Sequence, residues 1–189
     1  KIEEFPISLE EAWKRDAARE NGVGAQVIYT MHQKWLEYVG YRKYVPAENG
    51  KNCVICDVDG TVAQMEGRSA YDWNLVGTDK PREQIIKMVK SQIDDGDELI
   101  FLSGRDGICY EETHRWLEEH FQWHPFRLLM RPTGDTRKDV VVKRELFMEH
   151  INGKYDVLAA FDDRPCVVRL WLDMGLPNVT IVANPYIEF

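Results

Sequence analysis

Acidic, hydroxyl and cationic residues follow the ends of four apolar segments that we expect to be strands. The first segment is followed by Asp57-Val58-Asp59-Gly60-Thr61 and the second by Ser103-Gly104-Arg105-Asp106. A basic stretch with Lys138 and Lys143 lies between the third and fourth segments, and Asp162-Asp163-Arg164 follows the fourth. In an open parallel sheet, ligands bind beyond the carboxyl ends of the strands. The sequence therefore predicts that these side chains gather at one edge of a sheet.

Gathering Asp57, Asp59, Asp162 and Asp163 at one edge would crowd four negative charges. Two like charges ~4 Å apart repel by ~4 kcal/mol at an effective dielectric constant of ~20. Such a cluster therefore needs a cation, and oxygen ligands without histidine or cysteine favour Mg²⁺ over zinc. The same ion, with Lys and Arg side chains, can offset the repulsion between a carboxylate nucleophile and a phosphate dianion. The pattern indicates Mg²⁺-dependent phosphoryl chemistry.

The motif Asp-Val-Asp-Gly-Thr at 57–61, with Ser103, a downstream lysine and the pair Asp162-Asp163, resembles the haloacid dehalogenase superfamily of phosphatases. More closely, residues 53–183 resemble the phosphatase domain of phage polynucleotide kinase/phosphatase, which removes 3′-terminal phosphates from nucleic acid. The strings that carry this closer resemblance are Gly67-Arg68, Tyr71-Asp72, Ser103-Gly104-Arg105, Arg131, Gly134-Asp135-Thr136-Arg137-Lys138-Asp139, Val141-Val142-Lys143 and Asp162-Asp163-Arg164. The resemblance implies a phosphoric monoester hydrolase, a polynucleotide 3′-phosphatase of nucleic-acid end repair.

The resemblance also implies roles for the acidic residues. Asp57 is expected to be the nucleophile that forms an aspartyl-phosphate. Asp59 is expected to protonate the leaving sugar oxygen and then to activate water as a base. Mg²⁺ would be held by the Asp57 carboxylate, the main-chain carbonyl of Asp59 and the pair Asp162 and Asp163.

The remaining roles fall on hydroxyl and cationic side chains. By the same resemblance, Ser103 would donate a hydrogen bond to the phosphate, and Lys143 would balance charge on the nucleophile. Lys138 competes for that second role, because helical periodicity does not say which lysine faces the cleft. The set expected to contact substrate is Thr61, Arg68, Arg105, Arg131, Lys138 and Arg164. A planar guanidinium can bind two phosphate oxygens, but surface ion pairs are an open alternative for each arginine. A solvated helix face is likewise an alternative for the basic window 127–144.

Composition limits the class of protein. The chain has 189 residues, of which 44% are hydrophobic and 30% charged, so we expect one soluble catalytic domain with a small appendage. No apolar run approaches the ~20 residues that span a bilayer, and the N-terminus lacks the apolar core of a secretion signal. We therefore expect no membrane partner and a cytoplasmic location, which by the resemblance would be a phage-infected bacterial cell. A net charge of −8 argues against nonspecific nucleic-acid binding but leaves recognition of strand ends open.

Short apolar segments alternate with helical stretches from residue 53 onward. This pattern predicts an α/β fold with a three-layer, Rossmann-like parallel sheet, the haloacid dehalogenase fold that the resemblance also implies. The predicted strands are 53–58, 98–102, 126–130, 157–161 and 179–182. The predicted helices are 82–93, 109–121, 137–151 and 165–174. Cys53 and Cys56 lie on one strand and face opposite sides, so we expect core cysteines and no zinc or redox site.

The segments between the strands leave no room for a large cap domain. Only residues 60–97 separate Asp59 from the second predicted strand, and a helix occupies their later part. An open cleft suits the end of a polymer, whereas a closing lid suits a small metabolite that must be sealed from water. The open cleft therefore favours nucleic-acid 3′-phosphate ends as the partner. Both DNA and RNA remain candidates, because contacts to the 2′-hydroxyl group leave no local sequence motif.

The N-terminal part has a different pattern. Residues 8–39 predict a helical hairpin, and residues 41–52 predict a linker. We expect two domains, with residues 1–50 resembling the end of a polynucleotide kinase domain plus the linker, and residues 51–189 forming the phosphatase domain. The phosphate-binding loop Gly-x-x-x-x-Gly-Lys-Ser/Thr is absent from this sequence, and the chain begins with Lys1. This chain is therefore not expected to phosphorylate a 5′ end by that route. The resemblance of its N-terminal segment to the end of a kinase domain implies a covalently attached kinase domain in a longer parent protein.

Three other functions are compatible with parts of the pattern. A capless phosphatase of nucleotides or phosphoproteins would share the four loops but not the substrate. A phospho-acceptor receiver domain also combines aspartates, a hydroxyl and a lysine, but it carries the acidic pair after the first strand, which is the reverse of the order here. A nucleic-acid-binding module would tolerate replacement of Asp57, whereas a phosphatase would not.

Overall fold

The computed structural model of the chain describes residues 9–38 and 43–183. The chain forms two compact units, Lys1–Lys43 and Tyr44–Phe189, and the predicted linker 41–52 spans the division between them. Residues 44 and 45 bond within the second unit, because Tyr44 N donates to Met174 O (2.8 Å) and Val45 N donates to Asn152 Oδ1 (2.8 Å). The outermost residues of the predicted hairpin, 8 and 39, and residues 184–189 of the predicted phosphatase domain lie outside the described ranges.

The first unit is the predicted pair of helices, α1 (Leu9–Ala17) and α2 (Ala25–Tyr38). Its connecting turn is held by a buried carboxylate, since Asp16 accepts hydrogen bonds from the main-chain N–H groups of Val23 (2.9 Å) and Gly24 (2.8 Å). Trp13 Nε1 donates to Ala25 O at 3.1 Å, which ties the two helices together. The helical hairpin is thus confirmed.

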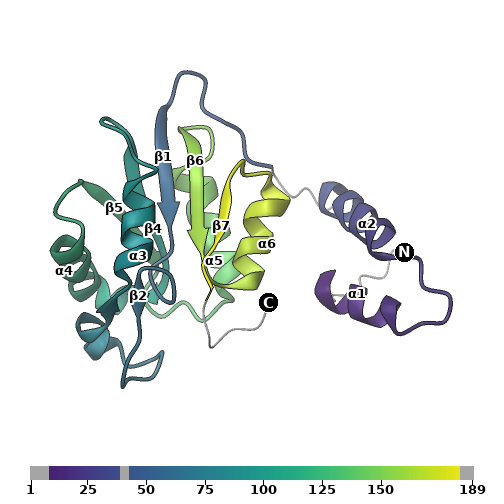
Figure 1. Cartoon of the computed structure of the whole chain (residues 1–189), viewed down its shortest axis with the longest axis horizontal. Coiled ribbons are helices and arrows are strands. Elements are labelled where there is room, and N and C mark those ends of the chain that lie inside the picture. Colours follow the sequence, from purple (N-terminus) through teal and green to yellow (C-terminus); the bar gives the residue numbers. More distant parts are fainter. Residues whose placement is uncertain (1–8, 39–42, 184–189) are drawn as a thin grey trace. The chain divides into compact units, whose positions relative to one another are not determined.

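The second unit is built on a five-stranded parallel sheet in the order β5-β4-β1-β6-β7 (Figure 1). The strands are β1 (Lys51–Cys56), β4 (Glu98–Asp106), β5 (Phe126–Arg131), β6 (Tyr155–Asp162) and β7 (Val179–Ile181). Each neighbouring pair is parallel. The predicted parallel sheet is confirmed, and its strand order places β1 and β6, which precede the two aspartate pairs, side by side.

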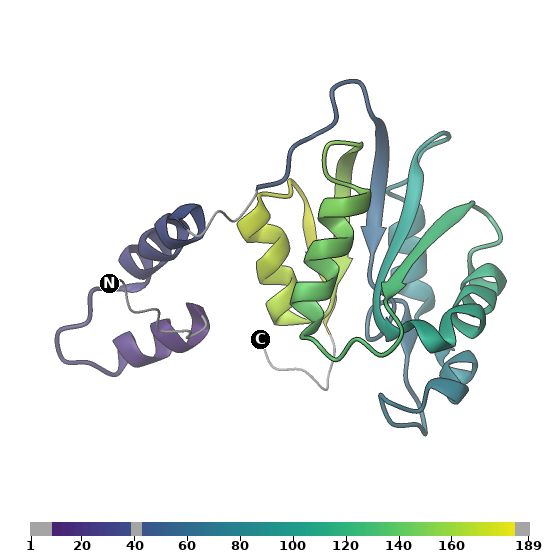
Figure 2. The same cartoon turned by 180° about the vertical axis from the view of Figure 1, so that it is seen from behind.

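Helices cover both faces of this sheet, which gives the three predicted layers. On one face, Val54 and Cys56 of β1 pack with α3 (Glu83–Lys90) and α4 (Tyr110–His120). On the other face lie α5 (Asp139–His150) and α6 (Pro165–Met174), seen in front of the sheet in Figure 2. Successive side chains of a strand point to opposite faces, and Cys53 and Cys56 are both buried and free. They are core residues, as predicted.

Several predicted boundaries beside the site are wrong. Strand β1 ends at Cys56 rather than at Val58, and β6 continues to Asp162. Strand β4 continues past Leu102 to Asp106, because Ser103 pairs with Met130 and Asp106 pairs with Arg131, with a register shift between the two pairs. Helix α5 begins at Asp139, two residues later than predicted, because Lys138 has an extended backbone (φ −58°, ψ 142°). Lys138 therefore precedes the helix, and helical periodicity does not apply to it.

The structure has a small excursion after β1, which was not predicted from the sequence. Two short antiparallel strands, β2 (Ala63–Gln64) and β3 (Lys80–Pro81), enclose residues 65–79, which include a 3₁₀-helix, η1 (Trp73–Thr78). This excursion packs against α4, where Trp116 Nε1 donates to Asp79 O at 2.8 Å. It is far smaller than a cap domain, which agrees with the prediction that no large cap is inserted. Across residues 9–38 and 43–183, every helix is too short or too polar to cross a membrane.

Phe101 offers a test of the core beneath the site. It is fully buried at the centre of β4, and its ring meets those of Phe121 (4.8 Å, 74°) and Phe126 (5.5 Å, 82°) edge-on. We expect Phe101→Ala to lower the free energy of unfolding by about 3–5 kcal/mol, because the ring's contacts are lost and a cavity remains. Urea denaturation monitored by circular dichroism measures this. The exposed Met88→Ala on α3 serves as the control, and an equal loss in both variants would contradict the described packing.

Candidate active site

The chain turns back sharply after β1. Asp57 N still bonds to Phe161 O of β6 (2.9 Å), and the next carbonyl, Val58 O, accepts from the N–H groups of residues 61, 62 and 63 (3.3, 3.0 and 2.9 Å). Gly60 lies inside this turn with φ 78°, a left-handed conformation that side-chain-bearing residues rarely adopt. The turn fixes Asp57 at the end of the strand and presents Asp59 two residues later in a different environment.

Three carboxylates meet at the edge of the sheet between β1 and β6. The nearest carboxylate oxygens of Asp57, Asp162 and Asp163 all lie within 4.8 Å of one another, and the three residues are buried. Among the residues that the structure describes, this is the only group of three or more acidic, histidine or cysteine side chains with such spacing. The structure thus brings Asp57 together with the pair Asp162 and Asp163, which follow it by about a hundred residues in the sequence, within the reach of one ion.

Lys143, one turn into α5, is buried among these carboxylates. Its Nζ lies 2.6 Å from Asp57 Oδ1 and 2.9 Å from Asp162 Oδ2, and 3.8 Å from Asp139 Oδ2. Thr61 Oγ1 donates to the other oxygen, Asp57 Oδ2, at 3.1 Å. Both carboxylate oxygens of Asp57 are therefore held in place.

The charges around Asp57 are not balanced by Lys143 alone. Burial raises the pKa of Asp57 well above its ordinary value, the Lys143 ammonium opposes that shift, and Asp162 and Asp163 reinforce it. Burial works to lower the pKa of Lys143, but the surrounding carboxylates of Asp162, Asp57 and Asp139 raise it well above its ordinary value. One ammonium thus faces a larger number of carboxylates, and the donor set is entirely oxygen, which suits Mg²⁺.

Asp59 belongs to a separate network. Its carboxylate forms a bidentate ion pair with Arg105, from Nε to Oδ2 (2.8 Å) and from Nη2 to Oδ1 (2.8 Å), and Arg68 Nη2 lies 3.3 Å from Oδ1. Burial works to raise the pKa of Asp59, but the charge and hydrogen bonds of Arg105, with Arg68, hold it below its ordinary value. Two aspartates on the same turn therefore have opposite electrostatic environments.

Asp79 holds this second network together. It accepts two hydrogen bonds from Arg68, at Nε and Nη2 (2.6 Å each), and one from Arg105 Nη2 (2.5 Å), and its side chain is fully buried. The sequence analysis missed Asp79, because a single acid before Lys80-Pro81 carries no motif. Arg68 and Arg105, expected to contact substrate, are both engaged with these carboxylates.

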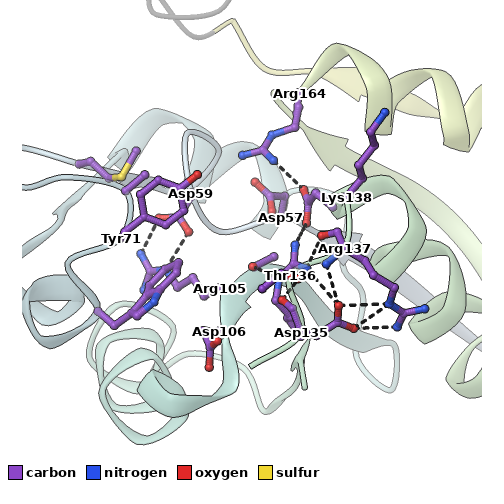
Figure 3. Close-up of a pocket in the computed structure, with 16 residues that line it drawn as sticks. Asp57, Asp59, Tyr71, Arg105, Asp106, Asp135, Thr136, Arg137, Lys138 and Arg164 are labelled. Carbon is purple, nitrogen blue, oxygen red and sulfur yellow. Dashed lines mark hydrogen bonds and ion pairs between the residues drawn. The ribbon is translucent and has the colours of Figure 1, made fainter. Parts of the chain in front are cut away.

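A cavity of about 570 Å³ opens above the carboxylates (Figure 3). Of the predicted site residues, six line it: Asp57, Asp59, Arg105, Arg131, Lys138 and Arg164. The others, Thr61, Arg68, Ser103, Lys143, Asp162 and Asp163, are not among the residues that line it. Ser103 is fully buried, and its hydroxyl accepts a hydrogen bond from Arg105 N at 3.2 Å.

The two candidate lysines occupy different places. Lys143 reaches Asp57 directly, whereas Lys138 is exposed at the cavity wall. In Figure 3, Lys138 lies on one side of Asp57, Tyr71 and Asp59 lie on the other, and Arg164 lies above Asp57. The cavity therefore has a cationic side and an aromatic side.

The cationic side is organised by another acid that the sequence analysis did not select. Asp139 lies 3.4 Å from Arg131 Nη2 and 3.2 Å from Arg164 Nη1. Asp139 precedes Lys143 by four residues on α5, so the two side chains lie on the same face of the helix, and this spacing could have identified Asp139 from the sequence. Gly104 on β4 leaves room for this carboxylate, since a Cβ at that position would overlap Asp139 Oδ1. The basic window 127–144 is therefore not one solvated helix face.

Comparison with known proteins identifies the family of the chain. Residues 51–186 match the family described as the polynucleotide kinase PNKP phosphatase domain. The chain belongs to this family. Membership makes it a phosphatase, and the enzyme class and the resemblance inferred from the sequence are confirmed.

Relatives with longer chains are similar to this phosphatase domain. A protein of Autographa californica nuclear polyhedrosis virus that carries the name bifunctional polynucleotide kinase/RNA ligase is 41% identical over 188 residues, 97% of this chain and 27% of its own length. In a structure titled as a Pnkp1/Rnl/Hen1 complex, a chain is 35% identical with a TM-score of 0.69, covering 78% of this chain and 51% of that one.

Two further structures extend the comparison. A chain of a Pnkp1/Rnl/Hen1 RNA repair complex is 30% identical with a TM-score of 0.68, covering 96% of this chain and 65% of that one. A HAD-like phosphatase of Mesorhizobium loti, 15% identical with a TM-score of 0.50 over 74% of this chain and 75% of that one, shares the fold. This chain thus spans from about a quarter to two thirds of the length of its nearer relatives.

Replacing Asp79 tests the arginine network. We expect Asp79→Asn to lower the free energy of unfolding by about 3–5 kcal/mol, because it leaves Asp59 as the one carboxylate that pairs with the two buried guanidinium groups of Arg68 and Arg105. Chemical denaturation followed by tryptophan fluorescence measures this loss. Glu145→Gln is the matched control, since it breaks an exposed ion pair with Arg137 and should leave stability essentially unchanged. Equal stability of both variants would show that Asp79 does not hold the network.

Proposed function

We propose that the protein removes 3′-terminal phosphates from nucleic-acid ends, with Mg²⁺ and through an aspartyl-phosphate on Asp57. The observation that carries this proposal is the buried cluster of Asp57, Asp162 and Asp163 with Lys143, of which Asp57 lines an open cavity. The family of the chain makes phosphate monoesters at polynucleotide ends the substrate class to test first.

Asp57 is placed to act as the nucleophile. An oxygen of its carboxylate attacks phosphorus, a new P–O bond forms, and the bond from phosphorus to the 3′ oxygen of the sugar breaks. The Lys143 ammonium and the Thr61 hydroxyl orient the attacking carboxylate through the two oxygens that they contact. The phosphoryl group then leaves Asp57 when water attacks the phosphorus.

Asp59 is assigned to proton transfer. It would give a proton to the departing sugar oxygen and take one from the attacking water in the second step. It lines the same cavity as Asp57, two residues further along the turn. Arg105 and Arg68 favour the ionised form of Asp59. An anionic phosphate that enters the cavity would compete with Asp59 for these guanidinium groups, and Asp59 could then hold a proton.

The residues around Asp57 fit a divalent cation. The carboxylates of Asp57, Asp162 and Asp163 supply oxygen ligands within 4.8 Å of one another, and the main-chain carbonyl of Asp59 is the further expected ligand. When bound, Mg²⁺ supplies positive charge that offsets the repulsion between the phosphate and the carboxylates.

Lys143 is our candidate for the catalytic lysine. It is the lysine that contacts both Asp57 and Asp162, and its side chain is 1% exposed. Lys138 and Arg164, both exposed enough to reach a ligand at the cavity wall, are candidates for contact with substrate phosphates, as is Arg131. Ser103 remains the proposed hydrogen-bond donor to the phosphate.

A polymer end suits the open cavity. Residues 65–79 form only a small excursion rather than a lid that seals the site from water. The names of the relatives refer to a polynucleotide kinase/RNA ligase and to an RNA repair complex. We therefore propose that this phosphatase domain acts in nucleic-acid end repair and that its longer parent carries a covalently attached kinase domain.

Matched strand ends test the proposed substrate. The protein is expected to release phosphate from DNA or RNA oligonucleotides that carry a 3′-phosphate, and to release little from free nucleotides, phosphopeptides or 5′-phosphate ends. EDTA should abolish the release and added Mg²⁺ should restore it, because the carboxylates around Asp57 repel the phosphate without a cation. Malachite-green detection of phosphate measures the rates.

Two variants sharpen this test. Asp57→Asn should lower turnover by at least about a thousandfold while the oligonucleotide still binds, because the nucleophile is lost and the cavity is kept. Lys90→Gln, an exposed residue of α3, is the control and should match the wild type. Faster hydrolysis of free nucleotides or phosphopeptides than of 3′-phosphate ends would instead favour a capless phosphatase of small or protein substrates.

A further inference from the structure

The aromatic side of the cavity has no part in the chemistry assigned so far. Met65, Ala70, Tyr71 and Trp73 line it, all from the excursion between β2 and β3. Tyr71 is 80% exposed, and its ring meets that of Trp73 edge-on at 6.1 Å and 84°. A large aromatic ring that lines a cavity and yet remains mostly in solvent has most of its face available to a ligand.

The turn that presents Tyr71 is fixed by its own hydrogen bonds. Ser69 N donates to Asp72 Oδ2 at 2.8 Å, and Tyr71 N donates to Ser69 Oγ at 3.3 Å. Trp73 N donates to Tyr71 O at 3.0 Å. These bonds fix the backbone from which the two rings extend, and a preformed turn reduces the entropy lost on binding.

The same segment is anchored to Asp59. Its two ends are joined by the bidentate ion pair between Arg68 and Asp79, and Arg105 bonds to both Asp79 and Asp59. These buried contacts set the position of the aromatic side relative to the proposed proton donor. Tyr71 and Asp59 line the same cavity, and Figure 3 draws both on the same side of Asp57.

We propose that Tyr71 and Trp73 form a stacking surface for the terminal nucleobase of a 3′-phosphorylated strand. The proposal rests on the proposed function, because it takes Asp59 as the group that protonates the sugar oxygen. With phosphorus at Asp57 and the sugar oxygen at Asp59, the sugar and its base lie on the side of Tyr71, and Lys138 lies across Asp57 from it.

Stacking would recognise the presence of a base rather than its identity. Each of the four bases has a π-face, so an aromatic surface accepts all of them, whereas hydrogen-bond readout discriminates among them. This matches an enzyme of strand ends, whose terminal residue varies. The excursion would thus select a nucleoside 3′-phosphate over a phosphate ester that lacks a base.

An abasic strand end isolates this contribution. We compare two oligonucleotides of equal length with a 3′-phosphate, one ending in a normal nucleoside and the other in an abasic sugar. The wild-type protein should show a kcat/KM about tenfold higher for the first, because stacking of one base contributes of this order. In Tyr71→Ala this ratio should fall to about 1, whereas Tyr71→Phe should keep it because the ring face remains.

Tyr110→Ala is the matched control. Tyr110 is an exposed tyrosine of α4, 37% exposed, that does not line the cavity, and its replacement should keep the wild-type ratio. The stacking proposal is overturned if the wild-type protein hydrolyses both ends equally well. It is also overturned if Tyr71→Ala lowers the rates on both ends by the same factor, because a merely structural role predicts that result.

Binding separates this proposal from the proposed function. Asp57→Asn, labelled and titrated with the same two oligonucleotides, should bind the base-containing end about tenfold more tightly. If the wild-type protein hydrolyses neither end, the 3′-phosphatase assignment fails, but this affinity ratio still measures stacking. Equal affinity for the two ends would overturn the stacking surface whatever the turnover.

Discussion

The structure of the site depends on one electrostatic constraint, the repulsion among buried carboxylates at the edge between β1 and β6. Asp57, Asp162 and Asp163 are brought within 4.8 Å of one another, where unscreened negative charges are unfavourable. Lys143 offsets part of this repulsion through direct contacts with two of them. The remaining charge makes the cluster receptive to a divalent cation and to the phosphoryl chemistry that such an ion assists. The fold must supply the rigidity that keeps these side chains together.

A second constraint separates the functions of two aspartates that are neighbours in sequence. Asp57 lies against Lys143, whereas Asp59 lies against Arg105, which Asp79 orients from the excursion between β2 and β3. The tight turn after β1 sends the two carboxylates into these two networks. The same ion pairs anchor the excursion that carries the aromatic side of the cavity, so the excursion links the proposed proton transfer at Asp59 to the proposed recognition of a nucleobase.

Much of the fold followed from local patterns in the sequence. Apolar runs bounded by polar turns located the strands of the parallel sheet, and the residues after β1 and β6 located the carboxylate cluster. The predictions that were wrong or missing concern contacts between segments far apart in the sequence, which local sequence patterns do not reveal. Strand β4 was predicted to end at Leu102, because pairing with β5 across a register shift leaves no periodic signal. Asp79 was not predicted because its role depends on ion pairs with Arg68 and Arg105, which come together only in the folded structure. Lys138 and Lys143 could be told apart only when the start of α5 was known.

The central claim is that one divalent ion completes the carboxylate cluster around Asp57. Crystals of the protein soaked in Mn²⁺, which takes the place of Mg²⁺ and scatters anomalously, test it most directly. The account predicts one strong anomalous peak bonded to Asp57, Asp162 and Asp163, at about 2.0–2.3 Å from their oxygens, as is usual for such ions, and no such peak in Asp163→Ala. A peak bound elsewhere in the second unit, with this cluster unchanged, would contradict it.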